Sequence, residues 1–285
     1  MVFGLLPNQG LNLRFLAVFA LLFGFLHAEV MLLKEYKDEN LSGWVMSEKF
    51  DGVRAIWDGK NLKSKNGKII NAPIWWLESF PPFMIDGELW SQRGEFEKIT
   101  SIVSDAHPSN EWQSIKFMIF DLPQVSGNLQ ARLEILRKFL AKNPNKFINV
   151  IDQKPVSSNQ MAFDFLDDVT AIGGEGIVVR DPNAAYIGGR SSKILKLKKF
   201  KDSECEVVEL RKGNGKYAGV LGSLVCKDIF SGVSFKIGSG FSDFQRANPP
   251  KIGSIITYKY QNLTKFNKPR FPVFLRVKSD IILSK

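Results

Sequence analysis

The feature that most constrains this chain is the charged stretch at residues 48–54, which lies between two apolar segments of strand-like composition. It places Lys49, Asp51 and Arg54 around Gly52. Alternate side chains of an extended segment share a face, so Lys49 and Asp51 are expected to point the same way. A solvated charge pair is one interpretation, because most lysines are exposed. A site for phosphate and metal is the other, and the rest of the chain favours it.

The length and charge of the chain limit its class. With 285 residues it can form one large or two modest domains. It carries 39 Lys and Arg against 29 Asp and Glu, which predicts a polyanionic partner but does not separate nucleic acid from an anionic membrane. Two histidines are too few for a Cys/His metal cluster. The two cysteines, Cys205 and Cys226, could pair in an oxidising compartment or remain as buried thiols.

Residues 1–28 have the pattern of a secretory signal peptide. Arg14 precedes an apolar run of eleven residues at positions 15–25, and Ala28 offers a small residue for cleavage. A membrane span needs about 20 apolar residues. We therefore expect export, cleavage near Ala28 and no stable membrane association afterwards. The alternatives are an uncleaved anchor, or translation from Met31, which would leave the protein in the cytoplasm.

Two apolar segments, each expected to form a strand, contain candidate residues of a functional site. The first is expected at residues 83–90 and contains Asp86 and Glu88, although buried strands rarely hold carboxylates without a partner. A hairpin turn at this point would also account for these acids. The second strand is expected at residues 115–123, where Phe120 by itself is typical of a core residue.

Glycines and lysines mark the next two elements. Glu175 lies among the glycines of residues 173–176, directly before an apolar strand. Such a run indicates a close approach of the backbone and a carboxylate with a set direction. In residues 192–199, alternation places Lys196 and Lys198 on one face. Without further context this is an exposed basic strand.

Helices and a second domain complete the prediction. Apolar residues at helical spacing predict helices at 96–103 and 129–142. From about residue 200, five short apolar segments with glycine-rich connections predict a small OB-type barrel, a fold that binds nucleic acids.

The stretch at residues 49–54 resembles the nucleotidyltransferase signature of ATP-dependent DNA ligases, Lys-x-Asp-Gly-x-Arg. Further family elements follow in order along the chain: Ser64 to Gly67, Asp86 to Glu88, Phe120, Glu175 with Gly176, Lys196 with Lys198, and a loose match at Arg276 to Lys278. The resemblance covers nearly all of residues 34–285 and is strongest to the minimal periplasmic bacterial type. It implies an α+β fold, with an ATP-grasp-like nucleotidyltransferase (adenylation) domain at residues 29–199 and an OB-fold domain at residues 200–285.

The resemblance also implies roles for individual residues. Lys49 would attack ATP and carry AMP as a covalent lysyl-AMP intermediate. The implied nucleotide-binding residues are Glu48, Arg54, Glu88, Phe120, Glu175, Lys196 and Lys198. The implied ligands of Mg²⁺ or Mn²⁺ are Asp51, Glu88 and Glu175. The implied DNA contacts are Arg54, Lys65, Lys265, Arg270, Arg276 and Lys278. Lys65 stands where the family has an arginine, which keeps the charge but loses the bidentate fork.

The expected substrate is nicked double-stranded DNA, with no obligate protein partner. One alternative is an RNA ligase or capping-type guanylyltransferase, which shares the lysine chemistry. The other is a non-catalytic nucleic-acid-binding protein on the same fold. The Asp-Gly-Glu context and the C-terminal barrel favour DNA. The presence of Lys49, Glu88, Glu175 and Lys196 argues against the non-catalytic protein.

Overall fold

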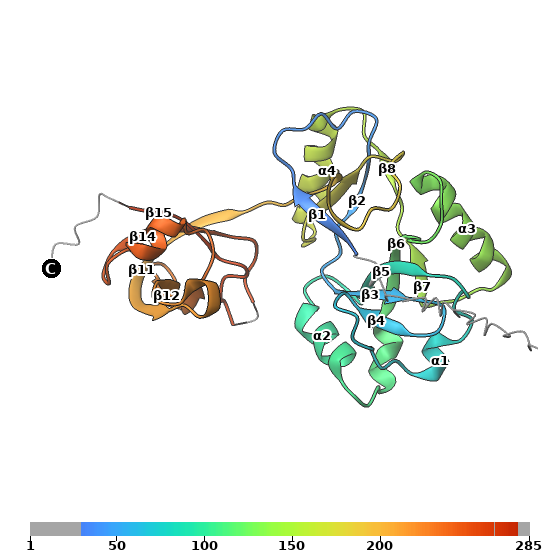
Figure 1. Cartoon of the computed structure of the whole chain (residues 1–285), viewed down its shortest axis with the longest axis horizontal. Coiled ribbons are helices and arrows are strands. Elements are labelled where there is room, and N and C mark those ends of the chain that lie inside the picture. Colours follow the sequence, from blue (N-terminus) through green and yellow to red (C-terminus); the bar gives the residue numbers. More distant parts are fainter. Residues whose placement is uncertain (1–29, 265, 279–285) are drawn as a thin grey trace, which may run out of the picture.

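The structure, a computed structural model, describes residues 30–264 and 266–278. The predictions for residues 1–28 and for Lys265 lie outside this part of the chain. The described residues form three five-stranded sheets, two in the N-terminal part and one in the C-terminal part (Figure 1). None of the described helices is long and apolar enough to cross a membrane.

The first sheet gathers strands from both ends of the N-terminal domain. Its spatial order is β1 (Met31–Glu35), β10 (Gly189–Leu197), β9 (Ile177–Arg180), β2 (Val45–Glu48) and β8 (Lys154–Pro155). Strand β1 runs parallel to β10, and the other pairs are antiparallel. Helix α4 (Asn159–Ala171) covers this sheet, and its N-cap is Ser158, whose side chain accepts from the amide of Met161. This order brings the ends of β2, β9 and β10 together.

The second sheet has the order β4 (Leu62–Ser64), β3 (Val53–Trp57), β5 (Ile85–Trp90), β6 (Lys116–Asp121) and β7 (Ile148–Val150). The helices of this half are α1 (Ile74–Leu77), α2 (Phe96–Ser104), the 3-10 turn η1 (Asn110–Ser114) and α3 (Leu129–Lys142). Trp76, Trp112 and Phe117 are fully buried in the core that these elements share. The predicted strands and the two predicted helices are confirmed.

Residues 49–52 are a connection between the two sheets, not a strand. The chain leaves β2 in the first sheet and enters β3 in the second. A side chain at Gly52 would collide with the carbonyl oxygen of Leu89, so the chain can pass β5 only with glycine there. The expectation of an extended segment, on which a shared face for Lys49 and Asp51 rested, is therefore wrong. The two side chains have different partners: Lys49 pairs with Glu175, and Asp51 pairs with Arg270 of the C-terminal domain.

The C-terminal domain contains the five predicted strands. Their order is β13 (Ser234–Ile237), β12 (Leu221–Asp228), β11 (Lys201–Lys212), β14 (Ile255–Tyr260) and β15 (Val273–Val277), with the short elements η2 (Gly215–Tyr217) and α5 (Asp243–Ala247) between them. A bridge between Ser239 and Val273 joins the two edges of the sheet. The sheet is an OB-like fold without full barrel closure, and the α+β fold class is confirmed.

Cys205 and Cys226 form a disulfide between the neighbouring strands β11 and β12. Their Cα atoms are 5.6 Å apart, and both residues are fully buried in the core of the C-terminal domain. Of the two alternatives that the sequence left open, the structure shows the paired form.

Candidate active site

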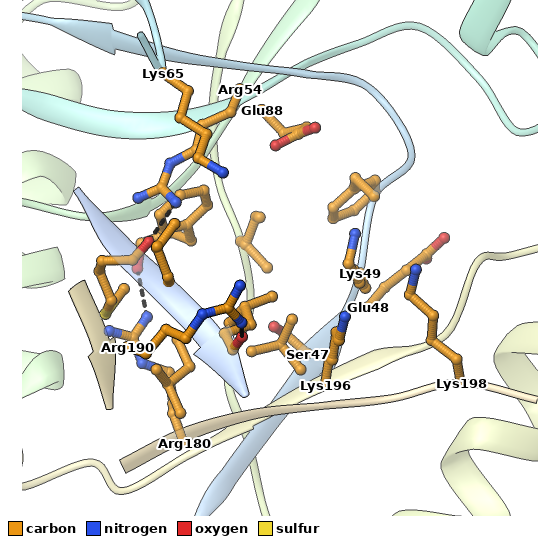
Figure 2. A pocket seen from close by; sticks show the side chains of 18 residues that line it. Ser47, Glu48, Lys49, Arg54, Lys65, Glu88, Arg180, Arg190, Lys196 and Lys198 are labelled. Atoms are coloured by element: carbon orange, nitrogen blue, oxygen red, sulfur yellow. Dashed lines mark hydrogen bonds between the residues drawn. The ribbon is translucent and has the colours of Figure 1, made fainter. Parts of the chain in front are cut away.

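A cavity of about 390 Å³ lies between the two sheets of the N-terminal domain. This volume falls within the range of about 300–1,000 Å³ that is usual for small-molecule sites. Strand β10 of the first sheet, with the residues just after β2 and β10, supplies Lys196, Lys49 and Lys198 to one side of the cavity, as Figure 2 shows. The second sheet and its β4 turn supply Arg54 and Lys65 to the other side.

The lysine side of the cavity is built around Glu175. Its Oε2 lies 2.5 Å from Lys49 Nζ, and its Oε1 pairs with Lys198. Glu175 and Lys198 are largely buried, with side chains 7% and 11% exposed. Burial acts to raise the pKa of the Glu175 carboxyl, but Lys49 and Lys198 together hold it below its usual value. Glu175 is therefore a carboxylate at neutral pH, and it holds both ammonium groups in place.

The backbone around Glu175 explains how it reaches Lys49. Gly176 has φ +151°, and a side chain there would collide with the carbonyl oxygen of Leu197 at the end of β10. Its own carbonyl oxygen accepts from the amide of Lys49 at 2.9 Å. The glycine thus lets three chain segments approach closely, as the glycine-rich sequence predicted.

The arginine side depends on paired, buried charges. Arg54 makes two hydrogen bonds to fully buried Asp86, from Nε to Oδ1 at 3.0 Å and from Nη2 to Oδ2 at 2.6 Å. Its Nη1 donates to the carbonyl oxygen of Met31 at 2.5 Å. The guanidinium lies 5.1 Å from the centre of the Phe120 ring. Asp86, for which a hairpin turn was one interpretation, lies within β5 as the partner of Arg54.

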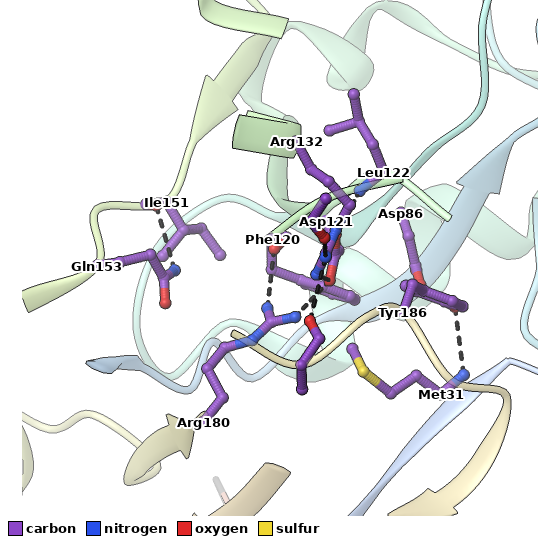
Figure 3. A network of polar contacts seen from close by, with 12 residues as sticks. Met31, Asp86, Phe120, Asp121, Leu122, Arg132, Ile151, Gln153, Arg180 and Tyr186 are labelled. Atoms are coloured by element: carbon purple, nitrogen blue, oxygen red, sulfur yellow. Dashed lines mark hydrogen bonds and ion pairs between the residues drawn. The ribbon is translucent and has the colours of Figure 1, made fainter. Parts of the chain in front are cut away.

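Asp121, the residue after Phe120, forms ion pairs with two arginines (Figure 3). Asp121 is fully buried, accepts from Arg132 Nε at 2.7 Å and Nη2 at 3.0 Å, and pairs with Arg180. Arg180 Nη1 also donates to the carbonyl oxygen of Phe120 at 3.0 Å. This network fixes the backbone that carries the Phe120 ring into the cavity.

Glu88 lies on β5 opposite Arg54 of β3 and lines the same cavity. Burial raises the pKa of Glu88 to about 7, against the opposing influence of Lys49 and Arg54. A carboxyl group with this pKa changes its charge near neutral pH, which is typical of residues that work in a site.

The structure brings most of the predicted site residues together. Those that line the cavity are Glu48, Lys49, Arg54, Lys65, Glu88, Phe120, Lys196 and Lys198. Glu48 also forms an ion pair with Arg93 at 2.6 Å, and Lys196 lies 3.5 Å from Glu35.

The three predicted metal ligands are not brought together. Asp51 lies in a neighbouring hollow, where its Oδ2 is 2.6 Å from Nη1 of Arg270, and Glu175 is occupied by two lysines. Within the described residues, no group of three or more His, Cys, Asp or Glu side chains could hold a metal ion. Of the three, Glu88 is the one that lines the cavity.

The cations predicted to contact DNA fall into two groups. Arg54 and Lys65 line the cavity, whereas Arg276 on β15 and Lys278 just after it belong to the C-terminal domain. Lys278 pairs with Glu204, and Arg270 joins the two domains through Asp51.

Sequence reasoning missed several residues of the site. Arg190 lines the cavity and donates to the carbonyl oxygen of Leu33 at 3.4 Å, and Arg93 holds Glu48. Neither carried a recognisable signal. Arg180 did carry one, because an arginine at the end of an apolar strand needs a buried partner.

Comparison with known proteins agrees with this geometry. The model of the ATP dependent DNA ligase domain matches residues 30–198, and that of the DNA ligase OB-like domain matches residues 212–278. A DNA ligase of Haemophilus influenzae is 44% identical over 263 residues, which cover 92% of this chain and 97% of that protein.

Solved structures show the same relationship. One from a structure-function study of Lig E DNA ligases has 40% identity and a TM-score of 0.83, covering 88% of this chain and 99% of the other. The Chlorella virus DNA ligase-adenylate, 23% identical with a TM-score of 0.53, covers 88% of this chain and 99% of its own, and it supports the fold alone. The chain belongs to the family of ATP-dependent DNA ligases.

Proposed function

We propose that this ligase seals 5′-phosphorylated nicks in duplex DNA through an AMP group carried on Lys49. The observation that carries the proposal is the position of Lys49 Nζ at the cavity, 2.5 Å from Glu175 and close to Lys198. An amine held in this way can attack a phosphorus atom of a nucleotide bound between the two sheets.

Three steps follow from this arrangement. In the first, Lys49 Nζ loses a proton and forms a bond to the α-phosphorus of ATP, and pyrophosphate leaves. In the second, the AMP passes to the 5′-phosphate of the nick and frees the lysine. In the third, the 3′-hydroxyl attacks the activated 5′-phosphate, the phosphodiester forms and AMP leaves. Lys196 and Lys198 lie where their charges stabilise the transferring phosphate, and the Phe120 ring offers a stacking surface for adenine.

We propose that Glu88 contributes to binding Mg²⁺ or Mn²⁺. Its carboxylate is a hard oxygen ligand that lines the cavity, and Mg²⁺ is commonly held by one or two carboxylates together with substrate phosphates and water. A bound divalent cation would neutralise charge on the phosphates during transfer. Asp51, which the sequence predicted as a ligand, is committed to Arg270.

The assay that tests the function uses a duplex with one 5′-phosphorylated nick. We expect sealing with ATP and Mg²⁺, no sealing with GTP, and none when the nick carries a 5′-hydroxyl. Matched nicks with RNA strands test the RNA ligase alternative. GTP-dependent activity, or sealing confined to RNA, would refute the proposal.

We further propose that the protein is exported to the periplasm. The disulfide between Cys205 and Cys226 supports this, because such bonds persist in oxidising compartments. Met31 lies within β1, and its amide hydrogen bonds to Tyr186, so a chain starting at Met31 would place a charged amino group there. Cell fractionation with N-terminal sequencing should find a periplasmic protein that begins near Glu29. A cytoplasmic product that begins at Met31 would refute export.

A further inference from the structure

The hydroxyl of Tyr186 connects three of the groups that surround Arg54. It donates to Asp86 Oδ2 at 2.7 Å and accepts from the amide of Met31 at 3.2 Å (Figure 3). Arg54 Nη2 lies 3.5 Å from the same oxygen. Burial, followed by the charge of Asp86, raises the pKa of the Tyr186 hydroxyl. The hydroxyl therefore keeps its proton and remains a donor to the carboxylate.

Strand β1 completes this arrangement through its backbone. The carbonyl oxygen of Met31 accepts from Arg54 Nη1, while its amide donates to Tyr186. Met31 is 5% exposed, and the next two residues of β1 line the cavity. One peptide strand thus touches both the arginine and the tyrosine, and the tyrosine touches the carboxylate that holds the arginine.

The hydrogen-bond count of Arg54 shows why its direction matters. A guanidinium has five N–H groups. Asp86 takes two of them, Met31 takes one, and the Tyr186 hydroxyl lies near another. One Nη1 hydrogen is left without a protein acceptor in the described part of the chain. A phosphate that binds at Arg54 must approach along a direction set by the other bonds.

We propose that Tyr186 is a positioning residue for the ligation reaction: through Asp86 and the Met31 peptide, it holds Arg54 in the direction that the 5′-phosphate of the nick requires. This inference rests on the proposed function and takes Arg54, one of the DNA contacts that the family resemblance implies, as the residue that binds the 5′-phosphate. It concerns recognition of the nick, because the hydrogen bonds of Tyr186 in the described part of the chain lead to Arg54, Asp86 and Met31 and not to Lys49 or Glu175.

The test substitutes Tyr186→Phe, which removes the hydroxyl and keeps the ring. Tyr258→Phe is a matched control, since Tyr258 donates to Asp228 at 2.8 Å in the core of the C-terminal domain. The readout is the ratio of affinities of the adenylated enzyme for nicks with a 5′-phosphate and with a 5′-hydroxyl. We expect Tyr186→Phe to lower this ratio by up to about tenfold, the effect of one hydrogen bond. Tyr258→Phe should leave the ratio unchanged and should form lysyl-AMP at the normal rate.

Arg54→Ala separates this inference from the proposed function. If Arg54→Ala leaves the ratio unchanged, Arg54 does not read the phosphate and the proposed role fails. If Arg54→Ala lowers the ratio but Tyr186→Phe does not, the positioning role of Tyr186 is refuted. An equal loss with Tyr186→Phe and Tyr258→Phe would also refute it, because the effect would then be one of general stability.

Discussion

Three arginines near the cavity of the N-terminal domain and two cations at the end of β15 in the C-terminal domain are held in different ways. In the N-terminal domain, Arg54, Arg132 and Arg180 have side chains that are at most 16% exposed, and each is paired with a buried aspartate. In the C-terminal domain, the Arg276 side chain is exposed, and Lys278 is 37% exposed beside Glu204.

This difference fits two functions: orienting a single phosphate and attracting a DNA backbone. A cation that orients one phosphate must keep its direction, and a buried ion pair with several hydrogen bonds provides this. A cation that attracts a DNA backbone needs only its charge, because each contact releases a counterion wherever the phosphate lies along the surface.

The largest effect on stability is expected at Asp121. Asp121→Asn keeps the shape of the side chain but leaves Arg132 and Arg180 without their carboxylate. Removing one partner of a buried ion pair costs about 3–5 kcal/mol, and chemical denaturation should show this loss for the N-terminal domain. The control Asp228→Asn affects an aspartate with hydroxyl and amide donors, and we expect a smaller loss. Equal losses in the two variants would contradict the comparison.

The next effect concerns the disulfide, which stabilises the C-terminal domain without any charge. Cys205 and Cys226 are 21 residues apart, and closing such a loop stabilises a fold by about 3 kcal/mol in the chain-entropy account. Reductant should therefore lower the melting temperature of this domain. Lysyl-AMP formation should continue at temperatures where sealing has stopped. A Cys205→Ala/Cys226→Ala variant should have a lower melting temperature, and reductant should not change it. If reductant still lowers the melting temperature of this variant, the disulfide is not the cause of the effect.

Glu88 should make the stability of the N-terminal domain depend on pH. Its pKa is raised by burial from 4.5 to about 7, so the folded state binds more protons than the unfolded state between these values. The free energy of unfolding then falls as pH rises from about 4.5 to 7. Glu88→Gln should remove this part of the pH dependence when unfolding is followed by denaturant titration. An unchanged pH profile in Glu88→Gln would contradict the assignment.

The smallest effect is expected at a single exposed cation. Arg276→Ala on the edge strand β15 should reduce the slope of log affinity against log salt by about 0.9, the contribution of one phosphate contact. The preference for a 5′-phosphate should not change. Lys236→Ala, on the opposite edge strand β13, is the control and should leave the slope as it is. A changed phosphate preference in Arg276→Ala would mean that the C-terminal domain also orients the nick.

The sequence predicted those parts of the site whose geometry is local. Lys49, Glu175 and Lys196 each follow from a short motif at the end of a strand, and the sheet order then places those strand ends together. The five strands of the C-terminal domain were likewise visible as short apolar segments. Helix α4 was missed, although Ala162, Leu166 and Val169 form a buried face at helical spacing.

The sequence could not predict what depends on distant chain segments. The partner of Asp51 is Arg270, which lies 219 positions away. The direction of Asp51 depends on the turn at Gly52, which moves the chain from one sheet to the other. The groups that hold Arg54 of β3 likewise come from distant parts of the chain: the Met31 carbonyl of β1, Asp86 of β5, and Tyr186, which bonds to Asp86. Short sequence patterns do not predict contacts between residues that are far apart in the chain.

The central claim is that Lys49 carries the AMP. The direct measurement is incubation with α-labelled ATP and Mg²⁺, followed by denaturation, digestion and mapping of the labelled peptide. We predict label on the peptide that contains Lys49 and none in Lys49→Ala. Lys193→Ala should label normally, because Lys193 is exposed and paired with Asp181. Label on Lys196 or Lys198, or label that persists in Lys49→Ala, would contradict the account.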